Sequence, residues 1–515
     1  MAVIDAQRGY NTAFAAAPSV PAAIAGLALL AAVFHVVTPF NHDEAYFMVA
    51  GGWLLDGGRF GKDILDFNPP HVFWISVIPV WLAREIGARV DIVATFFTAA
   101  LAAISLIVSD RLIATGKPAA MAPRALLPIA AIIVLFAPGY DFGQREHWMV
   151  LLTLPYVIAR CRRADGATLS PAVAVMIGVA ACLGFCIKPY YLLVPVALEL
   201  WLLMRTRRSL IWIAPETMAM GIAGLAYLVA VIVYVPTYFS EALPNALLGY
   251  WSFKGALSTV LWVAVILTVP AVVLGLLGYI TRRRVEGIPT LAQAFAMTGV
   301  AFLVAAVWQM KPWSYHFLPS AVFLDLAVAV LLVGPAARAG ASTIRFGALF
   351  ALIVCGCLPS ITEVDLRFND NATAARVEKL AAVFRAHPGP NAEVAGFLTS
   401  PRDVFPAVVA SRMNWAVPFC CDYLIAAAVR ADEAPAAERQ AIRTAGVNQA
   451  ERAIAAMRAK KPGVIVIDAG KRMLGFRNLD FDYLRWLGAR TDVADLLRHY
   501  REIGPVGSFR LFVRK

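Results

Sequence analysis

Residues 41–74 read NHDEAYFMVAGGWLLDGGRFGKDILDFNPPHVFW and decide the class of this protein. The stretch lies between two apolar segments of the chain. Its ionisable side chains include His42, Asp43, Glu44, Asp56, Asp63 and Asp66. A dense acidic loop therefore lies at the edge of a membrane, and we interpret it as the catalytic loop of a membrane enzyme.

The composition points to an integral membrane protein. Hydrophobic residues make up 60% of the 515 positions and charged residues only 16%, and the mean hydropathy is +0.69. A soluble enzyme of this size could not sustain these values. The net charge of +12 fits Lys and Arg loops retained on the cytoplasmic side, so nucleic-acid binding is not expected.

The apolar segments predict a polytopic α-helical protein. A bilayer core about 30 Å thick needs about 20 apolar residues per helix. Apolar runs, several of them short, occur near residues 22–37, 71–83, 92–109, 125–139, 147–159, 171–187, 190–204, 211–235, 256–280, 288–308, 318–334 and 343–359. The first run is expected to be a retained membrane helix, because no cleavable signal pattern precedes it.

Basic clusters predict the topology. They are Arg111/Lys117/Arg124, Arg160/Arg162/Arg163, Arg205/Arg207/Arg208, Arg282/Arg283/Arg284 and Arg338/Arg345. Each lies one pair of runs from the next, so all are expected in the cytoplasm. Parity then requires one early run not to cross, and we expect 71–83, which follows Pro69 and Pro70, to lie along the outer leaflet. The prediction is about eleven transmembrane helices plus a membrane-lying helix, with the unusual polar motifs on the periplasmic face.

Near residue 361 the sequence changes from long apolar runs to segments of mixed polarity. Helices are expected at 374–386 and 436–460, and short strands at 464–467 and 509–513. We therefore divide the chain into a transmembrane catalytic domain, 1–360, and a soluble periplasmic α/β domain of about 150 residues, 361–515.

Asp43 and Glu44 are the first candidates for chemistry. A carboxylate in a half-buried cleft can act as a general base, a metal ligand or an anchor for a sugar hydroxyl. The alternative is a helix N-terminus, with Asn41 or Asp43 as the cap and Glu44 in the first turn. Aromatic side chains such as Tyr46 favour function, because their faces can hold a sugar ring or an interfacial lipid.

A second constellation, YDFGQREH, occupies residues 140–147. Its charges would be costly between apolar segments unless they pair or meet a polar substrate. Arg145, Glu146 and His147 are therefore candidate binding residues. The alternative is local pairing of Arg145 with Asp141 or Glu146.

Isolated cations form the third group. Lys188 precedes a Pro-Tyr-Tyr run, and Lys311 opens a KPWSYH run that includes Tyr315 and His316. Cations at outward helix ends oppose the positive-inside bias, which suggests an anionic ligand such as a lipid phosphate. The alternative is a lysine that extends to the lipid headgroups.

Several motifs are missing from the sequence. It contains no P-loop, H-E-x-x-H, G-x-S-x-G or dinucleotide fingerprint, which disfavours nucleotide-driven transport and hydrolysis of these types. No Cys or His spacing indicates a metal site. We expect no metal and no cofactor, although oxygen ligands are present.

The motifs together resemble the GT-C type membrane glycosyltransferases, in particular the bacterial group related to protein O-mannosyltransferases and the aminoarabinose transferase. The resemblance covers about the first 320 residues. It consists of Asp43-Glu44-Ala45-x-Tyr46 after the first span, Asn68-Pro69-Pro70 before a short aromatic helix, Glu146 at the opening of a later span, and Tyr315-x-x-x-Pro319. Many relatives carry Lys where this chain has Asn68, and Asp where it has Glu146.

The resemblance implies an inner-membrane enzyme that transfers a sugar, with inversion, from a polyprenyl-phosphate donor to a periplasmic glycolipid, polysaccharide or protein. Asp43 would be the base and Glu44 would support it. The implied substrate-binding residues are Tyr46, Asn68, Arg145, Glu146, His147, Lys188, Lys311, Tyr315 and His316.

Two other functions fit parts of the pattern. A transporter or flippase of lipid-linked or anionic precursors would carry charges near the bilayer midplane and show repeat symmetry, whereas here the charges gather at one face. A membrane-anchored binding or assembly protein would instead work through the exported domain.

Overall fold

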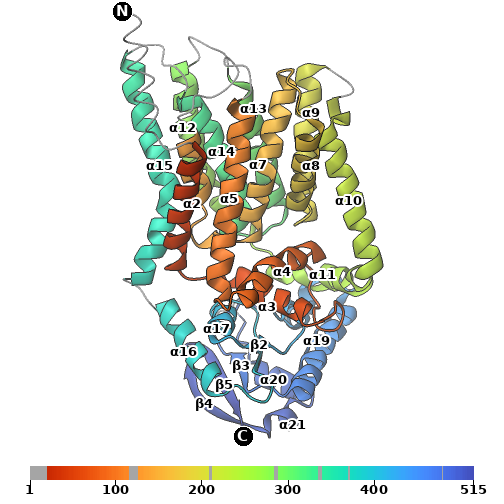
Figure 1. The fold of residues 1–515 in the computed structure, drawn as a ribbon. Coiled ribbons are helices and arrows are strands. Elements are labelled where there is room, and N and C mark those ends of the chain that lie inside the picture. The colour runs from red at the N-terminus through yellow and green to blue at the C-terminus, as the bar shows by residue number, and fades with distance from the viewer. Residues whose placement is uncertain are drawn as a thin grey trace, which may run out of the picture.

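The computed structural model describes residues 20–114, 126–207, 211–282, 288–333, 339–368, 372–471, 473–477 and 479–515. Figure 1 shows long helices standing side by side, and a smaller part with a β-sheet at one end of them. Short helices lie between these two parts. Of the basic residues used to predict topology, Lys117, Arg124, Arg208, Arg283, Arg284 and Arg338 lie outside the described residues.

The long helices form the membrane part. They are α2 (Val20–Val36), α5 (Val90–Ala114), α6 (Leu126–Phe136), α7 (Arg145–Ala164), α8 (Pro171–Phe185), α9 (Leu193–Thr206), α10 (Pro215–Tyr234), α12 (Leu257–Arg282), α13 (Thr290–Trp308), α14 (Ser314–Val333) and α15 (Ala339–Phe368). Within the described ranges, six helices are long and apolar enough to cross a membrane, and α2, α6 and α8 are shorter apolar helices. The protein is a mostly helical, multi-pass membrane protein, and the count of about eleven crossings stays a prediction.

Buried charges hold the bundle together at the end away from the sheet. The fully buried guanidinium of Arg160 on α7 donates to Glu199 on α9 (2.6 Å) and to Glu216 on α10 (2.8 Å). Arg163 also donates to Glu216 (3.0 Å). At the same end, Arg205 donates to Thr290 (2.8 Å). These basic residues therefore gather at the end opposite to the acidic loop.

The acidic loop forms helices across the other end of the bundle. Helices α3 (His42–Leu55) and α4 (Pro70–Glu85) lie with α11 (Leu243–Gly249) between the long helices and the sheet (Figure 1). Gly51 allows α3 to approach α4, since a Cβ there would lie 2.9 Å from the carbonyl oxygen of Ser76. The position of α4 is the one expected for the run 71–83 if it does not cross.

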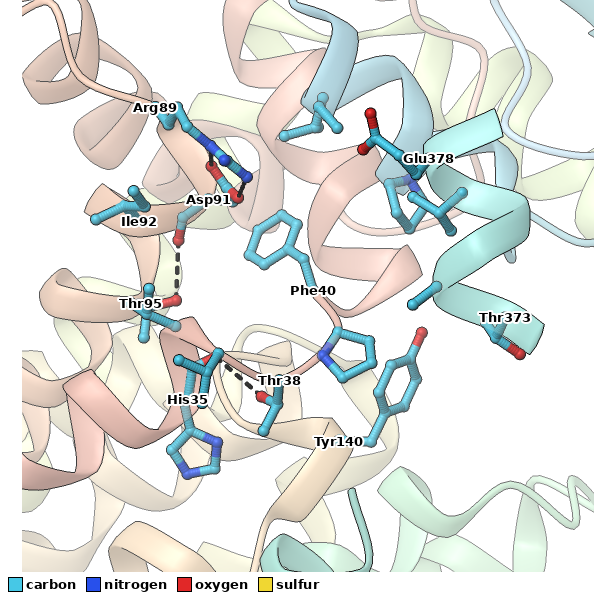
Figure 2. Close-up of a pocket in the computed structure, with 18 of the residues that line it drawn as sticks. His35, Thr38, Phe40, Arg89, Asp91, Ile92, Thr95, Tyr140, Thr373 and Glu378 are labelled. Atoms are coloured by element: carbon cyan, nitrogen blue, oxygen red, sulfur yellow. Dashed lines mark hydrogen bonds and ion pairs between the residues drawn. The ribbon is translucent and has the colours of Figure 1, made fainter. Parts of the chain in front are cut away.

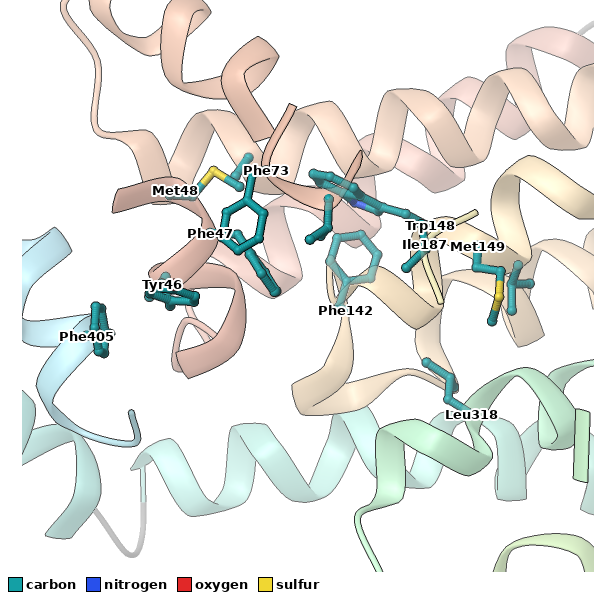
Figure 3. Packing of buried hydrophobic residues seen from close by; sticks show 14 of the residues in the cluster. Tyr46, Phe47, Met48, Phe73, Phe142, Trp148, Met149, Ile187, Leu318 and Phe405 are labelled. Atoms are coloured by element: carbon teal, nitrogen blue, oxygen red, sulfur yellow. The ribbon is translucent and has the colours of Figure 1, made fainter. Parts of the chain in front are cut away.

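Aromatic packing joins these crosswise helices to the bundle. Figure 3 shows Phe47 and Phe73 between Tyr46 and Phe142, the latter in the loop before α7. The rings of Phe47 and Phe73 meet edge to face with centroids 5.4 Å apart. On the other side of α3, Tyr46 packs edge to face on Phe405 of the sheet part, at 5.2 Å. The acidic loop thus packs against both the membrane part and the C-terminal part of the protein.

The C-terminal part is a five-stranded mixed sheet with helices. Its strands are β1 (Glu393–Phe397), β2 (Asn414–Trp415), β3 (Val464–Asp468), β4 (Tyr500–Val506) and β5 (Phe509–Arg514), in the order β2-β1-β3-β5-β4. β1 pairs in parallel with β2 and β3, while β5 is antiparallel to β3 and β4. The helices are α16 (Ala372–Ala386), α17 (Val404–Ser411), α18 (Tyr423–Val429), α19 (Arg439–Lys460), α20 (Tyr483–Gly488) and α21 (Val493–Leu497).

The predicted elements of this part are present as α16, α19, β3 and β5. Strands β1, β2 and β4 were not predicted, because β2 has only two residues and β1 and β4 contain glycine. Helix α15 continues to Phe368, so the change from apolar to mixed sequence near residue 361 falls inside a helix. The division into domains at that point stays a prediction.

Candidate active site

The two polar loops meet where α3 and α7 begin. Asn41 caps α3, since its Oδ1 accepts hydrogen bonds from the backbone N–H groups of Asp43 (2.9 Å) and Glu44 (3.3 Å). Its Nδ2 donates to the backbone carbonyl of Tyr140 in the second loop (3.0 Å). A capped N-terminus favours carboxylates in the first turn. The capping alternative is therefore confirmed for Asn41, and this cap also orients Asp43.

Asp43 faces the start of α7. Gln144 caps α7 by accepting from the N–H of Arg145 (2.8 Å), and its Nε2 donates to Asp43 Oδ2 (2.9 Å). Nη2 of Arg145 lies 3.4 Å from the same oxygen. Burial opposes ionisation of Asp43, but His42, Arg145, Gln144 and Lys188 outweigh it and lower the pKa of this carboxyl. Asp43 is therefore ionised at neutral pH.

Arg145 connects three of the predicted residues. Its Nη1 donates to Oδ1 of Asn68 (2.6 Å), and its Nε donates to Oε2 of Glu146 (3.4 Å). Together with the contact to Asp43, these bonds use different nitrogens of one planar guanidinium. The guanidinium carbon lies 5.7 Å from the ring centroid of Tyr315. Arg145 thus holds a buried positive charge at the end of the membrane part.

Lys188 adds a second cation. It forms an ion pair with the fully buried Glu146, and its Nζ lies 3.4 Å from Nε2 of His316 and 5.2 Å from the ring centroid of Tyr315. Burial and the charge of Arg145 lower the pKa of Lys188 to about 8, against the attraction of Glu146. Lys188 is therefore still mostly protonated at pH 7.

Seven predicted residues are thus linked by contacts, and we refer to them as the central cluster: Asp43, Asn68, Arg145, Glu146, Lys188, Tyr315 and His316.

Glu44 points elsewhere. Its carboxylate packs against Gly143, where φ is +84° and an added Cβ would lie 2.5 Å from Oε1. No hydrogen-bond donor in the described part of the chain reaches that oxygen. Burial, together with the charge of Asp91, raises the pKa of Glu44 well above its ordinary value. The structure therefore favours a neutral Glu44 that fills space beneath the second loop.

Tyr46 and His147 brace the fold around the central cluster. Tyr46 is buried beneath the C-terminal part, against Phe405. His147 accepts from the N–H of Gly143 at Nδ1 (3.2 Å), and its Nε2 lies 3.0 Å from the carbonyl of Val134. These contacts are those of residues that hold the acidic loop and the second loop in place. A role in substrate binding stays a prediction for both residues.

Lys311 occupies a separate aromatic enclosure. Its Nζ donates to the carbonyl of Tyr250 (3.1 Å) and lies 3.7 Å from the ring centroid of Tyr250 and 5.2 Å from that of Trp313. No carboxylate in the described ranges forms an ion pair with it. Burial, helped by Lys254 and Lys188, lowers the pKa of Lys311 to about 6. Lys311 is therefore mostly neutral at pH 7.

The structure adds Asp66 and Gln144 to the candidate residues. Oδ1 of Asp66 accepts from both the backbone N–H and the Nδ2 of Asn68, each at 2.7 Å, and so turns Oδ1 of Asn68 toward Arg145. The signal was present in the Asp-x-Asn-Pro-Pro run, because Asp often bonds to the backbone two residues later. Gln144 carried no comparable signal, since an uncharged amide is unremarkable in a loop.

A metal site is not evident. Among the residues that the structure describes, no three His, Cys, Asp or Glu side chains converge as metal ligands would. The expectation that the protein uses no metal stays a prediction.

Comparison with known proteins identifies the fold. No protein-family model matches the chain, and no curated protein matches it in sequence. ArnT from Cupriavidus metallidurans bound to undecaprenyl phosphate is a similar solved structure, with a TM-score of 0.58, 12% identity, and coverage of 95% of this chain and 97% of ArnT. Apo ArnT gives a TM-score of 0.60 at 12% identity, over 95% and 96% of the two chains. The GT-C type resemblance is thus confirmed at the level of the fold.

Proposed function

We propose that this protein is a glycosyltransferase that moves a sugar from a polyprenyl-phosphate donor to a hydroxyl of a cell-envelope acceptor. The observation that carries the proposal is the contact between an ionised carboxylate, Asp43, and a buried cation, Arg145. A second cation, Lys188, lies next to them, because Glu146 pairs with both Lys188 and Arg145. The cluster lies at the end of a bundle of membrane helices. ArnT, which shares the fold, was solved with undecaprenyl phosphate bound.

The proposed reaction is a single displacement with inversion. Asp43 accepts the proton of the acceptor hydroxyl as its oxygen bonds to the anomeric carbon of the donor. The bond between that carbon and the phosphate oxygen breaks, and its electron pair leaves with the polyprenyl phosphate. Arg145 and Lys188 stabilise the charge that develops on this phosphate. The products are the glycoside, the lipid phosphate and a protonated Asp43.

Arg145 and Lys188 also make the pKa of Asp43 depend on whether the donor is bound. In the free protein Arg145 and Lys188 help to hold the pKa of Asp43 below its ordinary value, which makes it a weak base. A bound phosphate would share these positive charges and weaken their effect on the carboxylate. We infer that donor binding raises the proton affinity of Asp43 and so prepares the base when substrate is present.

The proposed location is the bacterial inner membrane, with the central cluster and the C-terminal part in the periplasm. It rests on the predicted topology, in which basic clusters remain in the cytoplasm. In the structure Arg160 and Arg205 lie at the opposite end of the bundle from Asp43. Labelling of single cysteines introduced at the exposed positions Lys62 and Arg207 in intact cells would test the orientation. Only the first should react with a membrane-impermeant maleimide.

The donor class is tested by transfer. Purified protein in lipid nanodiscs is mixed with undecaprenyl phosphate-linked hexose or aminopentose and with envelope extracts, and release of undecaprenyl phosphate is measured. The proposal expects release that requires both donor and extract. A protein that moves the donor lipid across the bilayer of a proteoliposome but never cleaves it would be a flippase, and the proposal would fall.

A further inference from the structure

A large cavity lies beside the central cluster, between the membrane part and the C-terminal part. Its volume is about 720 Å³, within the range of about 300–1,000 Å³ that is usual for ligand sites. It is formed by the segment after α2, the start of α5, Tyr140, and the helices α16 and α17. Figure 2 shows Phe40, Asp91, Thr95, Tyr140 and Glu378 around it.

The lining is rich in hydrogen-bond acceptors. Three carboxylates line it, and each is paired with an arginine: Asp91 with Arg89 (2.6 Å), Glu378 with Arg385 (2.6 Å) and Asp403 with Arg376 (2.8 Å). The hydroxyl of Thr95 already donates to the carbonyl of Asp91 (2.9 Å), so only its lone pairs remain for a ligand. A lining of this kind suits a ligand with many O–H donors. Its arginine, Arg89, is already paired with Asp91, so it is not free to bind a phosphate or carboxylate group.

Asp403 provides an independent sign of a ligand. Its side chain is 8% exposed, and Oδ2 accepts from Nε of Arg376 (2.8 Å). Oδ1 is buried and no hydrogen-bond donor in the described part of the chain reaches it. The backbone at Asp403 has φ +67°, a conformation that is costly for residues with a side chain. A buried acceptor left without a donor costs free energy, which a ligand hydroxyl in the cavity would recover.

Two side chains join the cavity to the proposed base. Tyr140 lines the cavity, and its hydroxyl lies 2.8 Å from Nδ1 of His42. Nε2 of His42 lies 3.6 Å from Oδ1 of Asp43. A molecule in the cavity therefore lies two side chains away from the carboxylate.

We propose that this cavity binds the glycan part of the acceptor, as a polyhydroxylated sugar without anionic groups. The identification of this sugar as the acceptor rests on the proposed transferase function, whereas the binding of the sugar does not. Asp403 is the main recognition group, since its free oxygen can accept from a sugar hydroxyl. The sugar extends from the cavity past Tyr140, so that its reacting hydroxyl reaches Asp43.

The test is binding without a donor. An array of neutral oligosaccharides of gluco, galacto and manno configuration, with their uronate and phosphate counterparts, is probed with the purified full-length protein. Asp403→Asn should weaken binding of the neutral glycans at least tenfold, and Ala375→Trp, which fills the cavity from an exposed position on α16, should do the same. Asp495→Asn and Ala382→Trp, which lie outside the cavity, are the matched controls and should bind as the parent protein does.

Three results would overturn the proposal. They are the absence of binding to every neutral glycan, a preference for the anionic counterparts, and equal binding by the parent, Asp403→Asn and Ala375→Trp proteins. Binding of undecaprenyl phosphate is measured separately and should be unchanged in both cavity variants. If glycans bind as expected but no lipid-linked donor is ever cleaved, the transferase function fails and the cavity remains a glycan site.

Discussion

Nη1 of Arg145 lies 2.6 Å from Oδ1 of Asn68. The family that the sequence resembles often carries lysine at the position of Asn68, directly before Pro-Pro, whereas this chain has an uncharged amide there. The structure brings a cation to the same place from another helix, because Asp66 orients Asn68 and Asn68 accepts from Arg145. We infer that Arg145 supplies the phosphate contact that lysine would make.

Removal of Arg145 should therefore weaken donor binding strongly. Arg145→Ala is expected to lose about 100-fold in affinity for undecaprenyl phosphate, since a charge-assisted hydrogen bond contributes about 1.5–3 kcal/mol. Arg145→Lys should recover only part of it, because one ammonium cannot reach Asn68 and Asp43 as a planar guanidinium does. Arg205→Ala, at the opposite end of the bundle, is the control. Unchanged affinity in Arg145→Ala would remove this residue from the phosphate site.

Donor affinity should fall with rising pH. The pKa of Lys188 is lowered to about 8, so the ammonium is charged below pH 8 and neutral above it. The dissociation constant of undecaprenyl phosphate is therefore expected to rise between pH 7 and pH 9, by about tenfold for the loss of one charged contact. In Lys188→Arg the cation stays charged, and the dependence should disappear. An identical pH profile for both proteins would contradict this role of Lys188.

Glu44 should tolerate loss of its charge. Burial raises its pKa well above the ordinary value, which favours the protonated form, and Gln is a close replacement for that form. Glu44→Gln is expected to retain transfer within about threefold, whereas Glu44→Ala opens a cavity against Gly143 and should lower the melting temperature. If Glu44→Gln instead lost transfer and kept donor affinity, Glu44 would act as an ionised catalytic group.

The ion network of Arg160 should matter for stability and not for chemistry. Arg160→Met leaves Glu199 and Glu216 without this buried partner, which is expected to cost about 3–5 kcal/mol. Thermal unfolding in nanodiscs measures the loss. The folded fraction should bind undecaprenyl phosphate as the parent does, and a selective loss of donor affinity without destabilisation would be the opposite result.

The sequence predicted the meeting of the two loops but not the direction of every side chain. Charge and topology were enough to place Asp43 and Arg145 at one end of the bundle, where they touch. Asp43 and Glu44 are neighbours in the chain, yet successive helical side chains point about 100° apart, so only one of them faces Arg145. His147 likewise turns into the fold, two residues after Arg145.

The cavity beside the site could not have been predicted. Its lining comes from the segment after α2 and from α5, α16 and α17, which are far apart in the sequence. Asp403 had no signal in the sequence, because its position depends on the pairing with Arg376 and on the packing of α17. Side chains brought together only by packing between the two parts of the protein require a structure.

The central claim is that Asp43 removes the proton of the acceptor while Arg145 and Lys188 hold the lipid phosphate. The most direct measurement is the single-turnover rate of sugar transfer in Asp43→Asn, with the affinity for undecaprenyl phosphate measured on the same protein. The amide keeps the shape and the contact from Gln144 but cannot accept the proton, so the rate should fall by about 10²–10⁴ while the affinity changes little. Transfer at the parental rate by Asp43→Asn would contradict the mechanism.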